Sequence, residues 1–167
     1  MKKWLCVFTL VTIFAAGTAF ADHPDGFGIG VQFGGGGSWS GGGFGASGIA
    51  LSLKIPSVPV FWTINLDIFN DAFGLGVAGD YFLIDKVLVT DIKLHWYLGL
   101  GGGVDIWFGD TLGLGASARL PIGLSWQPLD LLDVYLQIVP NIGVAILPDF
   151  HFPYGGYGGN LGIRIWL

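Results

Sequence analysis

Large apolar residues alternate with Gly, polar or charged residues along most of this chain, with a period of two. Successive side chains of a β-strand point to opposite faces, so this alternation predicts strands that each have one strongly apolar face. The pattern predicts eight such strands, over residues 27–34, 48–55, 60–68, 73–83, 93–108, 112–126, 134–141 and 160–167.

The connections between these segments are uneven in length. Residues 56–59 contain two prolines and predict a tight turn, because Pro cannot donate to a strand ladder. Residues 70–71 and 109–110 predict short turns on the opposite side. Two long loops are expected on that same side, over residues 35–43 and 145–157. Residues 84–92 are long for a turn, which leaves a strand extension possible there.

The charged residues that interrupt the apolar runs all fall on the face opposite the large apolar side chains. They are Lys54, Asp67, Asp80, Lys93, Asp105, Arg119 and Arg164. A soluble sandwich would bury its apolar faces, but here the other faces are Gly-rich or ionic. This arrangement favours a barrel with its apolar face toward lipid and its charges in the lumen.

The signs of these charges predict a closed lumen. The four cations nearly balance the three carboxylates, so each can find the partner that a buried charge needs. The interior of an eight-stranded barrel is only just wide enough for side chains to fill. We therefore expect paired charges and packed side chains inside the barrel, and no open pore.

Aromatic residues on the apolar faces lie near the ends of the predicted strands. They are Phe27, Phe33, Trp62, Phe73, Tyr81, Trp96, Phe108 and Trp126. Plain core aromatics would not sort to strand ends, whereas membrane barrels carry an aromatic girdle at each interface. The pattern predicts these two girdles.

Residues 1–21 have the features of a cleaved export signal. Lys2 and Lys3 precede an apolar stretch over residues 4–16, and Ala19 and Ala21 supply a small-x-small cleavage site. The alternative, a single-pass membrane anchor, is disfavoured because the apolar stretch is short. Cleavage after Ala21 would leave a barrel domain over residues 22–167 without cysteine, and so without disulfides.

Composition narrows the class of protein further. Hydrophobic residues make up 52% of the chain, and 12 acidic residues face only 7 basic ones, which argues against nucleic-acid binding. The Gly-rich stretches are incompatible with a spanning helix. Only a closed barrel then satisfies the backbone in lipid. The sequence thus predicts an all-β fold, an eight-stranded antiparallel transmembrane up-and-down β-barrel in the bacterial outer membrane.

Motifs that would indicate chemistry are weak. Residues 74–79 match the dinucleotide pattern G-x-G-x-x-G, but a strand-forming run follows where the motif requires a helix. His23, His95 and His151 are scattered and form no metal-ligand spacing. The sequence therefore predicts no catalytic, cofactor-binding or metal residues and no cofactor, and the protein is not expected to be an enzyme.

Residues 73–167 resemble a family of bacterial outer-membrane β-barrels of unknown function, similar in style to the OmpA, OmpX and OmpW barrels. The resemblance rests on four short stretches, residues 79–81, 118–124, 134–140 and 162–167. Gln137 stands where such sequences usually carry Glu. The resemblance implies an outer-membrane location and a barrel fold, and it implies no activity.

Three functions remain open from the sequence. The leading one is a small structural or surface-interacting barrel, monomeric, with outer-membrane lipid and the barrel-assembly machinery as its partners. The second is an OmpW-like conduit for small hydrophobic molecules. The third is a lipid-modifying enzyme that uses His95 as a base.

Overall fold

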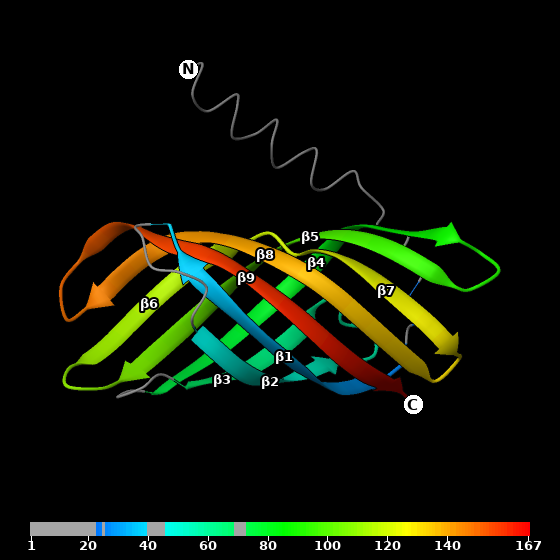
Figure 1. Cartoon of the computed structure of the whole chain (residues 1–167), viewed down its shortest axis with the longest axis horizontal. Helices are drawn as coiled ribbons and strands as arrows, with labels where there is room; N and C mark the ends of the chain where they lie inside the picture. Colours follow the sequence, from blue (N-terminus) through cyan, green and yellow to red (C-terminus); the bar gives the residue numbers. More distant parts are fainter. Residues whose placement is uncertain (1–22, 25, 40–45, 69–72) are drawn as a thin grey trace, which may run out of the picture.

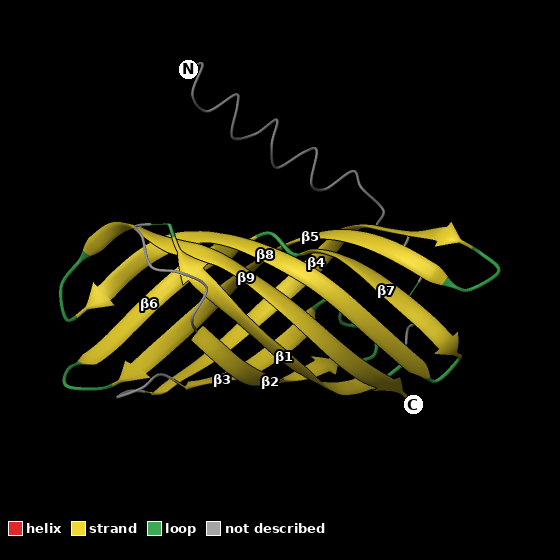
Figure 2. Cartoon of the chain, in the orientation of Figure 1, coloured by secondary structure: helices red, strands yellow, loops and turns green. Residues whose placement is uncertain are grey.

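The computed structural model describes residues 23–24, 26–39, 46–68 and 73–167, and they form a single antiparallel sheet. Its strands are β1 (Gly28–Ser38), β2 (Ala46–Lys54), β3 (Phe61–Ile68), β4 (Phe73–Val89), β5 (Leu94–Phe108), β6 (Leu112–Arg119), β7 (Ile122–Leu129), β8 (Leu132–Leu147) and β9 (His151–Trp166). Figure 2 shows the tilted strands wrapping around a common axis.

The sheet closes on itself because the first strand pairs with the last. Gly28 of β1 lies opposite Trp166 of β9, and the pairing continues to Ser38 opposite Gly156. β1 also pairs with β2, and the ladder continues from β2 to β5 in sequence order, then through β6 and β7 to β8 and on to β9 (Figure 1). Among the described strands none is left with a free edge, which is the property of a barrel.

Two of the nine strands, β6 and β7, are halves of one stave of the barrel. β5 pairs with β6 through residues 101–108 and with β7 through residues 94–98. Between them Pro121 has no N–H to donate, but its carbonyl still accepts a bond from the Gly99 N–H at 2.8 Å. The ring therefore has eight staves, and the predicted eight-stranded antiparallel barrel is confirmed.

The strand extension left possible over residues 84–92 is present, whereas both long loops differ from the prediction: residues 35–38 of the first belong to β1. β4 continues to Val89 and pairs with β5, so most of residues 84–92 are strand followed by a tight turn. The long loop expected over residues 145–157 is wrong, because β8 runs to Leu147 and β9 begins at His151. The β8–β9 ladder continues there as far as Ala145 opposite His151. The expected signal segment and residues 40–45 and 70–71 lie outside the described residues.

The two ends of the barrel carry different turns, and we call them the terminus end and the far end. The terminus end carries Leu167 and the turns at residues 90–93 and 130–131. The far end carries the turns at residues 109–111 and 148–150 (Figure 1). Among the described residues, no helix has the length and apolar character needed to cross a membrane.

Side chains sort to the two faces of the barrel with the expected alternation. Large apolar residues such as Val31, Ile64 and Leu161 are exposed on the outside. Their neighbours in sequence, among them Gln32 and Thr63, are buried inside. The barrel thus has an apolar outer wall and a polar or Gly-rich inner wall.

Candidate functional site

Aromatic side chains fill the lumen near the terminus end. Phe61, Phe82, Tyr97 and Trp166 are all buried and form the cluster that we call the closing layer. The rings of Phe61 and Phe82 stack at 4.2 Å, and those of Phe82 and Tyr97 stack at 4.4 Å. The Tyr97 hydroxyl donates to Gln137 Oε1 at 3.0 Å, which anchors the layer to β8.

His23 lies against this layer, ahead of β1. Its ring is 5.8 Å from Phe61 and 5.9 Å from Phe82, both edge-on. His23 Nδ1 lies 2.5 Å from Asp85 Oδ2, and the His23 backbone N–H donates to the same oxygen at 3.1 Å. The segment that precedes the first strand is therefore fastened to the inside of β4.

A second buried group continues this network across the lumen. The Ser125 hydroxyl donates to Asp133 Oδ1 at 2.5 Å and lies 3.0 Å from His23 Nε2. Arg164 donates to the other oxygen of Asp133 at 2.9 Å and to the Ser52 hydroxyl at 2.9 Å. Ser125 and Asp133 have no exposed surface. These residues tie β7, β8, β9 and β2 together in the interior.

Five of the charged residues predicted for the lumen lie in the interior, and each contacts an identified partner. Arg164 is paired with Asp133, and Arg119 Nε lies 3.0 Å from Asp80 Oδ1. Asp67 and Asp105 both accept a hydrogen bond from the Asn65 amide. A sixth, Lys54, is buried, donates to the Ile55 carbonyl at 3.2 Å and lies 5.8 Å from the Phe61 ring centre.

Lys93 corrects the prediction, because its side chain is half exposed and lies outside the lumen. The residue has a φ of 50° in the turn before β5, so strand alternation does not apply to it. Its ammonium forms an ion pair with the exposed Asp130 in the neighbouring turn. This contact lowers the pKa of the Asp130 carboxyl below its ordinary value of 3.8.

Four buried interior residues were not among the predicted lumen residues: His23, Asp85, Ser125 and Asp133. Asp85 is an odd position in β4, where odd positions such as Leu75 face outward, but the register shifts between Phe82 and Ile84. That bulge reverses the alternation and turns Asp85 inward. Two of the four carried a signal in the alternation: Ser125 has the inward parity of the predicted strand 112–126, and Asp133 has that of the strand predicted from residue 134.

These additions change the charge balance of the lumen. The described interior now holds three cations and five carboxylates, histidines aside: Lys54, Arg119 and Arg164 against Asp67, Asp80, Asp85, Asp105 and Asp133. The near-balance expected from the sequence is therefore wrong, and the interior has an excess of negative charge.

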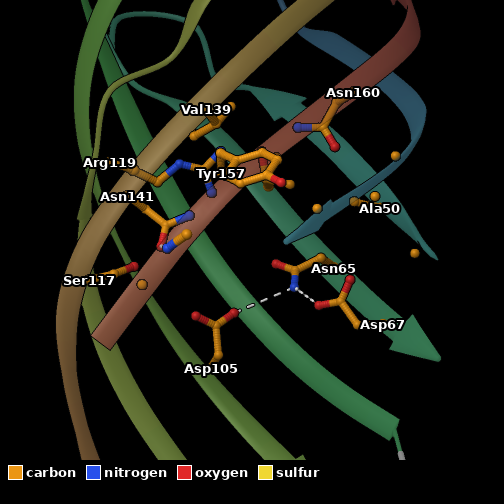
Figure 3. A pocket seen from close by; sticks show the side chains of 18 of the residues that line it. Ala50, Asn65, Asp67, Asp105, Ser117, Arg119, Val139, Asn141, Tyr157 and Asn160 are labelled. Carbon is orange, nitrogen blue, oxygen red and sulfur yellow. Dashed lines mark hydrogen bonds between the residues drawn. The ribbon is translucent and has the colours of Figure 1, made fainter. Parts of the chain in front are cut away.

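A cavity of about 510 Å³ occupies the lumen in the far half of the barrel. Polar side chains from several strands point into it (Figure 3). Asn65 Nδ2 donates to Asp67 Oδ2 at 2.8 Å and to Asp105 Oδ1 at 3.5 Å, so one amide bridges two carboxylates. Arg119 lines the same cavity and pairs with Asp80, which leads toward the closing layer.

The expected girdle residues all lie at outward positions. Phe73 and Phe108 are exposed near the far end, and their rings stack at 4.8 Å, whereas the exposed Phe33 lies in the middle of β1. Toward the terminus end lie Phe27, Trp62, Tyr81, Trp96 and Trp126. Because β4 extends to Val89, Tyr81 lies in the middle of its strand, level with the beginning of β3.

His23 and His95 come together although the sequence showed no metal-ligand spacing. Their ring centres are 5.2 Å apart, and His95 Nδ1 lies 3.9 Å from Asp85 Oδ1. His151, in contrast, is exposed at the beginning of β9, at the far end. Folding thus separates the three histidines into one buried pair and one surface residue.

This architecture, with the closing layer toward the terminus end and a cavity toward the far end, defines a small closed eight-stranded β-barrel. Its fold is similar to that of the neisserial surface protein A, NspA, with a TM-score of 0.52 and 12% identity over 84% of this chain and 96% of that one. It is also similar to the N-terminal β-barrel domain of OprF from Pseudomonas aeruginosa, with a TM-score of 0.50 and 13% identity over 83% of this chain and 96% of that one. No protein-family model and no curated protein sequence matches the chain.

Proposed function

We propose that this protein is a monomeric barrel of the bacterial outer membrane that does not conduct solutes and that displays its far end outside the cell. The observation that carries this proposal is the closing layer, because Phe61, Phe82 and Tyr97 stack in succession across the lumen. The buried Arg164–Asp133 pair next to them adds a second obstruction. No wide aqueous path is compatible with this packing.

The membrane location rests on the outer wall and the closed ring. Outward residues such as Val31, Val77 and Ile163 are exposed, large and apolar along the strands. A closed barrel has no unpaired backbone edge, as the hydrocarbon region requires. The fold similarity to NspA and to the OprF barrel domain supports this location, as does the export signal expected over residues 1–21.

The barrel contains little that would suit an OmpW-like conduit. A pathway for hydrophobic molecules needs an apolar interior, whereas the cavity is lined by polar groups that include Asp67, Asp105 and Arg119. We therefore favour a structural or surface-interacting role. In that role the polar cavity and the far-end turns face the outside, and the terminus end faces the periplasm, where the barrel-assembly machinery would receive the chain.

Electrical recording in planar lipid bilayers tests this proposal. Purified protein is expected to insert without producing conductance steps, and a Phe82→Ala/Tyr97→Ala double variant is expected to produce them because it removes two stacked rings of the closing layer. A matched control, Phe33→Ala/Phe108→Ala, removes two outward rings and should remain silent. Steady conductance from the unaltered protein would contradict the proposal.

Labelling in intact cells tests the orientation. The single cysteine of the chain, Cys6, lies in the expected signal segment, so introduced cysteines can be read without background. Phe150→Cys places a thiol in the exposed far-end turn, and Asp91→Cys places one in an exposed turn at the terminus end. A membrane-impermeant maleimide should label only the Phe150 position. Labelling only at position 91 would reverse the proposed orientation.

A further inference from the structure

Three side chains that can bind a metal ion meet behind the closing layer, although they are far apart in the sequence. His23 precedes β1, Asp85 follows the bulge in β4, and His95 lies near the beginning of β5. All three are buried, and their ligand atoms lie within 4.8 Å of one another. The cluster is separate from the far-end cavity, whose lining includes none of them.

The hydrogen bonds around Ser125 determine which atoms of His23 carry protons. A serine hydroxyl has one hydrogen, and Ser125 donates it to Asp133 Oδ1 at 2.5 Å. Ser125 Oγ must therefore accept from His23, so His23 Nε2 carries a hydrogen. The other ring nitrogen, Nδ1, then faces the Asp85 carboxylate at 2.5 Å. At this distance a proton lies between the two atoms. A metal cation could take the place of that proton if the two groups moved apart.

His95 favours the cation over the proton. Its Nδ1 faces Asp85 Oδ1 at 3.9 Å, which is beyond hydrogen-bonding range. Both oxygens of one carboxylate are thus directed at imidazole nitrogens from two different segments. A proton between His23 and Asp85 requires no third group, whereas a metal ion uses all three.

We propose that His23, Asp85 and His95 bind one divalent transition-metal ion of the zinc type. Two imidazole nitrogens and a carboxylate form a ligand set that zinc accepts, whereas magnesium and calcium prefer oxygen ligands alone. Zinc lies about 2.0–2.2 Å from such ligands, which places tetrahedral ligand atoms roughly 3.3–3.6 Å apart. The 2.5 Å and 3.9 Å separations lie on either side of this value, so small opposite shifts of the two imidazoles reach it.

The surroundings of the cluster match those of protein metal sites. Metal-bound histidine usually donates its second ring N–H to an acceptor that orients it, and His23 Nε2 has Ser125 and, through it, Asp133 in that position. The excess of carboxylates over cations in the lumen favours an added positive charge. Arg164 is already engaged by Asp133, which leaves Asp85 facing the two imidazoles.

Binding would fasten the segment ahead of β1 to the barrel wall. His23 belongs to no strand, and its described hydrogen bonds to the wall go to Asp85 and Ser125. An ion shared with Asp85 of β4 and His95 of β5 would hold this segment against the closing layer. The ion would therefore have a structural role, because it would link the segment ahead of β1 to β4 and β5 at the terminus end.

Metal titration of untagged protein purified from membranes in detergent tests the proposal. After chelation and dialysis, the protein is titrated with Co²⁺, and Zn²⁺ is then added as competitor. We expect one Co²⁺ per chain, with the visible absorption of a site that has nitrogen and oxygen ligands. His23→Gln and His95→Gln should each weaken binding at least tenfold, and Ser125→Ala should weaken it about 10–100-fold. His151→Gln is the matched control and should bind unchanged, because that residue is exposed at the far end.

Each variant is first checked for the folded form by its different gel mobility before and after boiling. If His95→Gln does not fold, His23→Gln still tests the site, because His23 lies outside the sheet. Two results would overturn the proposal. One is equal loss of Co²⁺ binding in His151→Gln. The other is absence of Co²⁺ binding by the unaltered protein, and a His23 ring protonated on both nitrogens in ¹⁵N spectra would then identify a simple ion pair with Asp85.

Discussion

The ring of Tyr97 lies directly over Gly123 on the neighbouring stave. A Cβ at Gly123 would be 2.4 Å from Tyr97 Cζ and 2.7 Å from the Leu136 carbonyl oxygen. Real Cβ atoms do not come this close, and the second neighbour is backbone that cannot rotate away. The absence of a side chain on β7 is therefore what allows a tyrosine from β5 to lie flat across the lumen.

Gly123→Ala should destabilise the barrel by about 1–3 kcal/mol, the usual cost of an added carbon in a tightly packed interior. Unfolding by urea in lipid vesicles, followed by tryptophan fluorescence, measures the change. Gly159→Ala is the matched control, because a Cβ at Gly159 meets no atom within 4 Å. Equal stability of the two variants would show that the Tyr97 ring is free to move.

Arg164→Met should destabilise the barrel by about 3–5 kcal/mol, since it leaves the buried carboxylate of Asp133 without its charged partner. Asp133→Leu alone should cost a similar amount by leaving the guanidinium buried. The double variant should recover part of the loss. A double-mutant cycle from urea unfolding gives the coupling, and effects that add within about 0.5 kcal/mol would contradict a strong pair.

Single-tryptophan variants should separate the outer wall from the lumen. Trp62 and Trp126 are exposed on the outside, whereas Trp107 lies over Gly113 inside and packs edge-on against Tyr154 at 5.5 Å. In vesicles that contain brominated lipid, fluorescence of the two outward residues should be strongly quenched. Trp107 serves as the inward control, and strong quenching of Trp107 would contradict the assignment of faces.

The Asp130 carboxyl should titrate below its ordinary value of 3.8, because the Lys93 ammonium stabilises its charged form. Since the folded-state pKa is the lower one, the contact stabilises the barrel above the unfolded-state value and loses this effect as the pH falls through the folded-state value. Carboxyl ¹³C shifts followed by NMR in detergent measure the titration. Lys93→Met should return the pKa to its ordinary value. The effect on stability should be small, because the pair is exposed to solvent.

How much of this molecule is predictable from its sequence depends on where the alternation of side chains is continuous. Ile29 to Phe33 and Leu161 to Ile165 lie in uninterrupted ladders, so period two assigned their faces correctly. Asp85 could not be placed, because one extra residue at the bulge reverses the parity of the strand beyond it.

The predicted lumen position of Lys93 was wrong for a related reason. It stands next to Leu94, where the ladder begins, but its left-handed backbone takes it out of the alternation. The buried cluster of His23, Asp85 and His95 combines both difficulties. It joins a non-strand segment to a strand after a bulge, and no local sequence spacing records that proximity.

The pairing of Gly28 with Trp166 has a kinetic consequence for assembly. β1, the first strand to be synthesised, finds its second partner only after β9 has been made, so the ring cannot close before then. Pairings so distant in sequence make folding slow, and until closure both lateral strands present open backbone groups. A truncation that removes β9 would therefore leave the backbone N–H and C=O groups on one side of β1 without partners. Such a chain should aggregate or be degraded instead of inserting as a smaller barrel.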